Sequence, residues 1–185
     1  TGVQTCALPI CSLLLQAAYK QGLSKGTTVL LTDGVYSEDF VKQTGKGSDG
    51  NSIISGALGT VPAADGKALQ AFTDKWKQKT GKQVTAYVPH SWDAAILLML
   101  AAQAAGNNTG EGIKSKIRDV ANGPGIEVTD PCEALTLLKQ GKDINYQGAS
   151  GNVDIDENGD VVGNYDVWQV EPNGTLKIVD KVRDR

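Results

Sequence analysis

Short apolar runs and longer segments with helical spacing alternate along most of the chain. The run that ends at Leu31 is β-branched at its start and wholly apolar after it, as a parallel strand buried on both faces would be. In the segment 67–81, Leu69, Phe72 and Trp76 recur at spacings of three and four residues, which predicts an amphipathic helix. The same reasoning predicts strands at 28–31 and 52–59, and helices at 12–23, 37–45, 67–81, 91–105, 111–122 and 129–141.

Capping residues set the expected helix ends. Ser91 is the predicted N-cap of the longest apolar helix, with Asp93 in its first turn. Asp130 and Pro131 predict the start of the last helix, because Pro is tolerated at the first helical position. The apolar run 94–105 is shorter than the ~20 residues needed to span a bilayer, so it is interpreted as a core helix.

The C-terminal region has a different pattern. Residues 152–182 alternate apolar and polar side chains around a Glu-Asn-Gly and a Pro-Asn-Gly turn, which predicts hairpins. The expected fold class is therefore α/β with a C-terminal β-meander.

The first residues of the chain do not fit these patterns. Residues 1–10 match no structural pattern and look like the translation of a sequencing adapter, whose last base would also supply the first base of the Cys11 codon. Residues 1–11 are therefore expected to be an adapter-derived artefact and are excluded from the fold prediction. The remainder, about 12 to 183, is expected to be a piece of a longer chain that lacks its N-terminal part.

Composition excludes some functions. The chain is 40% hydrophobic and 21% charged, with a net charge of −3 and a pI near 5.1. This balance argues against nucleic acid as a partner, because no basic surface neutralises phosphates. With Cys6 and Cys11 discounted, Cys132 stands alone. A small buried side chain is favoured for it over a disulfide to a missing part of the chain.

Several apparent catalytic or metal motifs are incomplete. Residues 154–160 imitate a calcium loop, but Tyr165 stands where the bidentate acid is needed. The Gly-rich segment 45–50 lacks the spacing of a phosphate-binding loop. The single His90 has no nucleophile in a recognised signature beside it and is interpreted as a helix-entry residue. No enzyme activity, metal or cofactor is expected.

Asp33 is the strongest binding candidate. It directly follows the predicted strand 28–31, and ligands of open α/β sheets bind outside the carboxyl ends of the strands. Asp-Gly is also a common turn pair, so Asp33 would equally serve to cap the following turn. Position alone leaves both interpretations open.

An ordered series of segments resembles a known family. The series comprises 30-LLTDG-34, 59-GTVP-62, 68-ALQAFTDKWKQKTG-81, 87-YVPHSWDAAILLMLAAQAAG-106 and 144-INYQGASGNVDIDENGDV-161. It resembles the C-terminal portion of the periplasmic amino-acid-binding proteins of ABC transporters, of the branched-chain (Leu/Ile/Val) type. The segment 146–151 is its most specific element.

The resemblance implies a two-lobed periplasmic binding protein type I fold, here the C-terminal part of both lobes. Residues 12–60 would form part of the C-terminal lobe and residues 63–150 part of the N-terminal lobe. Residues 151–183 would form a crossing and the terminal hairpin of the C-terminal lobe. The expected crossings are Thr60-Val61-Pro62 and a second within 150–164.

The resemblance also implies ligand-binding residues. Asp33 would receive the α-ammonium of an amino acid, Tyr87 would line the side-chain pocket, and Gly34 and Tyr36 would approach the ligand. Family members carry Glu where this chain has Asp33, and the shorter side chain leaves a polar or smaller amino acid open as the ligand. The groups that bind the α-carboxylate would come from the missing N-terminal part.

The implied partners are an amino acid and an ABC-transporter permease. Contact with a membrane would come only through the permease or a lipid anchor. The implied location is periplasmic or extracytoplasmic, with a signal peptide in the full gene. The alternative is a sensory or regulatory ligand-binding domain of the same fold that responds to an amide or urea.

Overall fold

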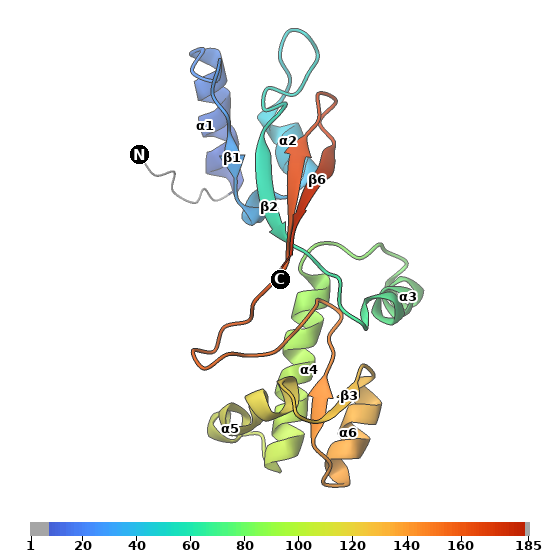
Figure 1. Cartoon of the computed structure of the whole chain (residues 1–185). Helices are drawn as coiled ribbons and strands as arrows, with labels where there is room; N and C mark the ends of the chain where they lie inside the picture. The colour runs from blue at the N-terminus through green and yellow to red at the C-terminus, as the bar shows by residue number, and fades with distance from the viewer. Residues whose placement is uncertain (1–7, 184–185) are drawn as a thin grey trace. The chain divides into compact units, whose positions relative to one another are not determined.

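The computed structural model describes residues 8–183, with side chains from residue 10 (Figure 1). The described chain divides into two compact units. Unit 1 contains the chain up to Pro62 and returns with Tyr165–Arg183, while unit 2 contains Ala63–Asn164.

Unit 1 is a four-stranded sheet with helices. Its elements are α1 (Leu8–Lys20), β1 (Leu30–Leu31), the 3-10 helix η1 (Asp33–Val35), α2 (Glu38–Thr44), β2 (Leu58–Pro62), β5 (Tyr165–Val170) and β6 (Leu176–Val182). The strand order is β1-β2-β5-β6. The β1–β2 pair is parallel and the other two pairs are antiparallel.

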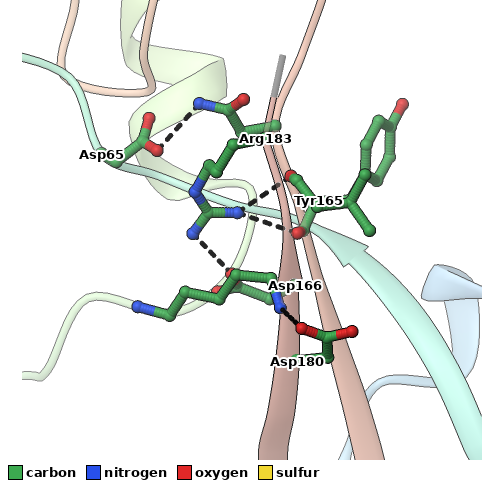
Figure 2. Close-up of polar contacts among 8 residues, drawn as sticks. Asp65, Tyr165, Asp166, Asp180 and Arg183 are labelled. Atoms are coloured by element: carbon green, nitrogen blue, oxygen red, sulfur yellow. Dashed lines mark hydrogen bonds and ion pairs between the residues drawn. The ribbon is translucent and has the colours of Figure 1, made fainter. Parts of the chain in front are cut away.

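The hairpin predicted around Pro172-Asn173-Gly174 is confirmed. β5 and β6 pair antiparallel, and the Glu171 and Thr175 backbones close the turn with a 2.9 Å hydrogen bond. At the open end, the Arg183 guanidinium donates to the Tyr165 carbonyl and to Asp166 Oδ1, both at 2.8 Å (Figure 2). The side chain of Arg183, the residue after β6, thus links the end of this strand to the start of β5.

The core of unit 1 centres on Trp168. This β5 side chain is fully buried and lies opposite Gly59 of β2. A Cβ on Gly59 would overlap the Trp168 ring and come within 2.9 Å of the Leu31 carbonyl oxygen. Gly59 is therefore needed for the close approach of the indole to the sheet.

Unit 2 is a helical layer around a short parallel strand pair. Its elements are α3 (Leu69–Thr80), α4 (Val88–Ala105), α5 (Gly110–Ala121), β3 (Ile126–Val128), α6 (Pro131–Lys139) and β4 (Ile144–Tyr146). β3 and β4 pair in parallel. One continuous core cluster joins Leu100 of α4, Val120 of α5, Val128 of β3, Ala134 of α6 and Ile144 of β4.

A buried carboxylate organises the loop that follows β4. Asp93 in α4 is only 2% exposed and accepts four hydrogen bonds. The donors are the Tyr146 hydroxyl at 3.1 Å, the Ala149 backbone at 3.0 Å, and the Ser150 backbone and hydroxyl at 2.7 and 2.5 Å. A buried charge needs such partners, so Asp93 and this loop form one structural element.

Two predicted strands differ from the structure. Ser52 forms only an isolated bridge with Lys46, residues 53–56 form turns with Gly56 at φ +84°, and β2 begins only at Leu58. The expectation that the run at Leu31 is buried on both faces is wrong for the described residues, because Leu30 is 69% exposed. β1 is the edge strand of the described sheet and pairs with β2 alone.

The start of α4 also differs from its prediction. The helix begins at Val88 rather than after Ser91, with Tyr87 as its N-cap and Pro89 in its first turn. Asp93 therefore lies in the second turn of the helix, and its side chain is buried.

The prediction that Cys132 is buried is wrong, because this residue is exposed.

The predicted start of α6 is confirmed. Asp130 Oδ1 accepts from the Cys132 and Glu133 backbones at 2.9 and 3.1 Å, and Pro131 is the first helical residue.

The hairpin predicted around the Glu-Asn-Gly turn is reduced to an isolated bridge between Ile155 and Val161. Residues 151–164 belong to unit 2 and Tyr165–Arg183 to unit 1, and the lobe assignments made from the sequence stay predictions.

The artefact predicted at 1–11 falls mainly outside the described residues and stays a prediction. Among residues 8–183, no helix combines the length and the apolar composition needed to cross a bilayer.

Candidate functional site

The loop between β1 and α2 holds Asp33 at the carboxyl end of β1. Asp33 opens η1, its carbonyl accepts from the Tyr36 backbone at 3.0 Å, and its side chain is exposed. Oδ1 of Asp33 accepts from the Gly34 backbone at 2.9 Å. The turn-capping interpretation therefore has a structural basis. The binding interpretation is compatible with it, because a carboxylate has several acceptor positions.

Tyr36 anchors this loop to the core of unit 1. Its ring lies 5.4 Å from the Trp168 ring, at an interplanar angle of 50°. Burial raises the pKa of the Tyr36 hydroxyl, and the negative charges of Asp166 and Glu38 raise it further. Tyr36 is partly buried, and Val35 beside it is fully buried. The backbone around Asp33 is thus held by two side chains that point into the protein.

Gly34 has open space around its Cα. A Cβ there would meet only the Thr32 hydroxyl oxygen, at 3.9 Å. Its N–H already donates to Asp33, so among the described residues this group serves the turn. Whether Gly34 approaches a ligand stays a prediction.

Tyr87 begins α4 in a strained backbone conformation. Its φ of +70° lies in the left-handed region, which is uncommon for a residue with a Cβ. The side chain is 38% exposed, and its ring lies 6.5 Å from the His90 ring. Strain of this kind persists only where the surroundings impose it, and it is enriched at ligand sites.

Tyr87 borders an apolar cavity in unit 2 of about 360 Å³. Its other lining residues are Phe72, Trp76, Ala86, Val88, Ser91, Trp92 and Ala95. The Phe72 ring lies 6.0 Å from Trp76 and 5.4 Å from Trp92, so three packed aromatic rings contribute to its wall. A second cavity of about 460 Å³ shares these rings and extends to Thr129, Asp130 and Pro131.

The four predicted ligand-binding residues fall in two places. Asp33, Gly34 and Tyr36 lie together in one loop of unit 1. Tyr87 belongs to unit 2 and lies beside the apolar cavity just described. His90, interpreted as a helix-entry residue, lies in the first turn of α4.

Sequence reasoning missed two features of unit 2. The Asp93 network was hidden because its donors lie 53 to 57 residues further along the chain. An isolated Asp in an otherwise apolar helical run was the available signal, since such a charge must find partners. The cavity wall was missed because it combines α3 with the start of α4.

The described residues contain no cluster of His, Cys, Asp and Glu suited to a metal ion. In the region that imitates a calcium loop, Asp156 Oδ1 accepts from the Asn158 and Asp160 backbones, both at 2.8 Å. These hydrogen bonds use the carboxylate to close a turn.

Residues 5–173 match the family described as the receptor family ligand binding region. This match extends over most of the chain, and the protein belongs to that family.

Two solved structures have a fold similar to that of this chain. A leucine-binding protein, LivK from Thermotoga maritima, is 25% identical with a TM-score of 0.66, over 96% of this chain and 43% of that one. LivJ from Streptococcus pneumoniae, a branched-chain amino acid transporter substrate-binding protein solved with isoleucine, has a TM-score of 0.63 at 16% identity, over 96% and 43%. The fold is thus that of periplasmic binding proteins of type I, and the chain spans less than half the length of these structures.

A curated relative has a different biological setting. BasB of Halobacterium salinarum, a substrate-binding protein of a chemotactic signal transduction system, is 33% identical over 90 residues. These residues are 48% of this chain and 22% of BasB. LivK, LivJ and BasB are all described as binding proteins.

Proposed function

We propose that the protein is an extracytoplasmic solute-binding protein that captures an amino acid for uptake by an ABC transporter. The main support is the similarity to LivK, which combines 25% identity with a TM-score of 0.66 over nearly all of this chain. LivK is a leucine-binding protein. The permease would be the partner that receives the ligand.

In this proposal Asp33 binds the ammonium group of the amino acid. The carboxylate is exposed and follows a strand of the sheet, and η1 and the Tyr36 packing hold the surrounding backbone. Opposite charges at about 4 Å attract by ~1 kcal/mol in bulk water and by ~4 kcal/mol at an effective dielectric constant of 20. Exclusion of water around the bound ligand would therefore strengthen this contact.

Tyr87 contributes the apolar part of recognition. The cavity beside it is lined by aromatic rings and small aliphatic side chains, which suit a hydrocarbon side chain. The left-handed backbone at Tyr87 is consistent with a side chain whose direction is imposed for binding. Leucine, isoleucine and valine are the ligands that best match such a surface.

The test is isothermal titration calorimetry on a chain extended to the complete ligand-binding region, since the 185 residues span 43% of LivK. The ligands are the twenty amino acids, urea and short amides. We expect micromolar binding of an α-amino acid, weakened at least about 30-fold by Asp33→Ala, because truncating one member of a desolvated charge pair costs roughly 2–5 kcal/mol.

Asp39→Ala is the matched control, because Asp39 is another exposed acid of unit 1 and pairs with Lys42. It should leave the affinity unchanged. Amino-acid binding that is indifferent to Asp33→Ala would reduce Asp33 to a turn residue. Binding of only urea or an amide would contradict amino-acid capture.

A second candidate function is sensory. The similarity to BasB favours it, because BasB belongs to a chemotactic signal transduction system. Deleting the gene separates the two functions. Loss of radiolabelled amino-acid uptake supports transport, whereas normal uptake with loss of the behavioural response to the same amino acid supports sensing.

A further inference from the structure

The larger cavity of unit 2, of about 460 Å³, is a groove that lies along α3. One wall is a face of this helix on which Ala71, Lys75 and Lys79 recur every four residues. The opposite wall is the connection between β3 and α6, formed by residues 129–131. Sites for small organic ligands span about 300–1,000 Å³, so the groove has room for one.

Aromatic rings give the groove an apolar lining. Phe72, Trp76 and Trp92 all contribute to it, and the Phe72 ring lies 6.0 Å from Trp76 and 5.4 Å from Trp92. Trp92 is 39% exposed, so part of this aromatic surface is accessible from solvent. Rings pack favourably against such a surface in offset or edge-to-face arrangements, which favours a ligand with an aromatic body.

Lysines line the groove on the α3 side, and two of them have acidic partners on the other side. Lys67 pairs with Glu127 at 2.6 Å, and Lys75 pairs with Asp130 at 3.3 Å. Lys79 lies one helical turn beyond Lys75 and has no ion pair within the described part of the chain. An anionic group at this end of the groove would give Lys79 the partner that the other two lysines already have.

A buried donor points to the same kind of ligand. Among the described residues, the indole nitrogen of Trp76 is buried and has no hydrogen-bond partner. A buried donor without an acceptor is costly, and an acceptor on a ligand would recover that cost. Trp76 and Lys79 are three residues apart on α3 and share a face of the helix. The two oxygens of a carboxylate can accept from both groups.

We propose that this groove binds a small aromatic carboxylate. Its ring packs against Phe72, Trp76 and Trp92, and its carboxylate accepts from Lys79 and from the Trp76 indole N–H. The site requires no ammonium group on the ligand, and its lining includes neither Asp33 nor Tyr87. It therefore gives unit 2 a ligand of its own, whether or not Asp33 binds an amino acid.

The indole N–H signals of tryptophan provide the test. A chain extended to the complete ligand-binding region is labelled with ¹⁵N-tryptophan and titrated with 3-phenylpropionate, and the Trp76 signal is assigned by its loss in Trp76→Phe. We expect this signal to shift saturably with a Kd on the order of 1 mM, as for a small ligand held in an open groove. Trp168 is the internal control, because its indole nitrogen is also buried without a partner among the described residues but lies in unit 1. Its signal should stay in place.

A matched pair of lysine variants tests the charge contact. Lys79→Ala should weaken binding about three- to fivefold, the range expected for a partly exposed ion pair. Lys77→Ala should leave the affinity unchanged, because Lys77 is an exposed lysine of the same helix that does not line the groove. The cation 2-phenylethylammonium, which carries the same ring with the opposite charge, should not shift the Trp76 signal.

Three results would overturn the proposal: no response of the Trp76 signal, equal binding of the cation, or equal affinities of Lys79→Ala and Lys77→Ala. Competition with leucine separates this site from the proposed amino-acid site. A response that leucine displaces, or that Asp33→Ala removes, would assign 3-phenylpropionate to the amino-acid site and would also overturn the proposal. A retained response in a protein that binds no amino acid would contradict only the proposed function.

Discussion

The two units are stabilised in different ways. In unit 1, β5 and β6 are neighbours in sequence, and Trp168 fills the space above Gly59 of β2. In unit 2, one carboxylate on α4 satisfies four donors at the end of β4 and in the loop after it, more than 50 residues away. Unit 1 therefore depends mainly on apolar packing, and unit 2 on a buried polar network as well. The difference predicts which substitutions each unit tolerates.

Removal of the Asp93 carboxylate should have the largest effect. Asp93→Ala leaves the Tyr146 hydroxyl and the donors of Ala149 and Ser150 without their acceptor inside the protein. We expect a loss of roughly 3–5 kcal/mol in the free energy of unfolding, because unpaired buried polar groups are costly. Urea unfolding measures the loss, and hydrogen exchange should show it first in residues 146–151.

Asp119→Ala is the control for this substitution. Asp119 is an exposed acid of unit 2 that pairs with Lys116, and exposed ion pairs contribute little to stability. If Asp93→Ala cost no more than Asp119→Ala, unit 2 would not depend on the network, and the contrast between the units would fail.

Gly59→Ala tests the packing in unit 1. A methyl group at this position would overlap the Trp168 ring, and the neighbouring Leu31 carbonyl oxygen belongs to the backbone and has little room to move. We expect a cost of about 1–3 kcal/mol, as for other overpacked cores. Near-UV circular dichroism should report the displaced indole, and thermal unfolding the loss of stability.

Gly110→Ala provides the comparison for Gly59→Ala, because nothing lies within 4 Å of a Cβ at Gly110. It should leave the Tm unchanged or raise it slightly. A Gly59→Ala protein that melts like Gly110→Ala would show that the indole shifts without cost.

The N-cap of α6 should have the smallest effect. Asp130→Ala removes the acceptor of the Cys132 and Glu133 backbones, at an expected cost of about 1 kcal/mol. The Glu133 backbone hydrogen bond is the main cause that lowers the pKa of Asp130, and those from Cys132 and Lys75 lower it further, against a smaller opposing effect of burial.

Because the folded-state pKa of Asp130 is depressed, its contribution is present above the unfolded pKa of about 3.9 and is lost as the pH falls through the folded value. The stability difference between wild type and Asp130→Ala should therefore shrink in urea titrations below about pH 4. A difference that stayed constant down to pH 2 would contradict this assignment.

Features that depend on near neighbours in sequence were predictable. Pro172-Asn173-Gly174 between two alternating segments predicted the β5–β6 hairpin, and Asp130-Pro131 predicted the start of α6. The resemblance to branched-chain amino-acid-binding proteins agreed with the fold of LivK and LivJ. The α/β fold class followed from the same patterns.

Features that depend on distant residues were not predictable. The start of α4 at Val88 was missed because Ser91 offers a conventional N-cap, whereas the actual N-cap, Tyr87, takes a left-handed conformation that a side chain rarely adopts. β3 and β4 are three residues each, too short to stand out from the loops. At the candidate site, the sequence placed Asp33 correctly after a strand, but it did not predict the Trp168 contact of Tyr36, which joins residues 132 positions apart.

Pro62 pairs with Tyr165 at the end of the β2–β5 ladder, and the next backbone bond joins the Ala63 N–H to the Asn164 carbonyl at 2.9 Å. Residues 63–164 are thus an insertion between two adjacent strands, and the chain enters and leaves this insertion at one point. Joining β2 directly to β5 through a two-residue hairpin turn would remove the insertion without stretching either strand. The pairing of β2 with β5 therefore continues up to the point where the chain leaves unit 1, so the 102 intervening residues leave the register of this strand pair intact.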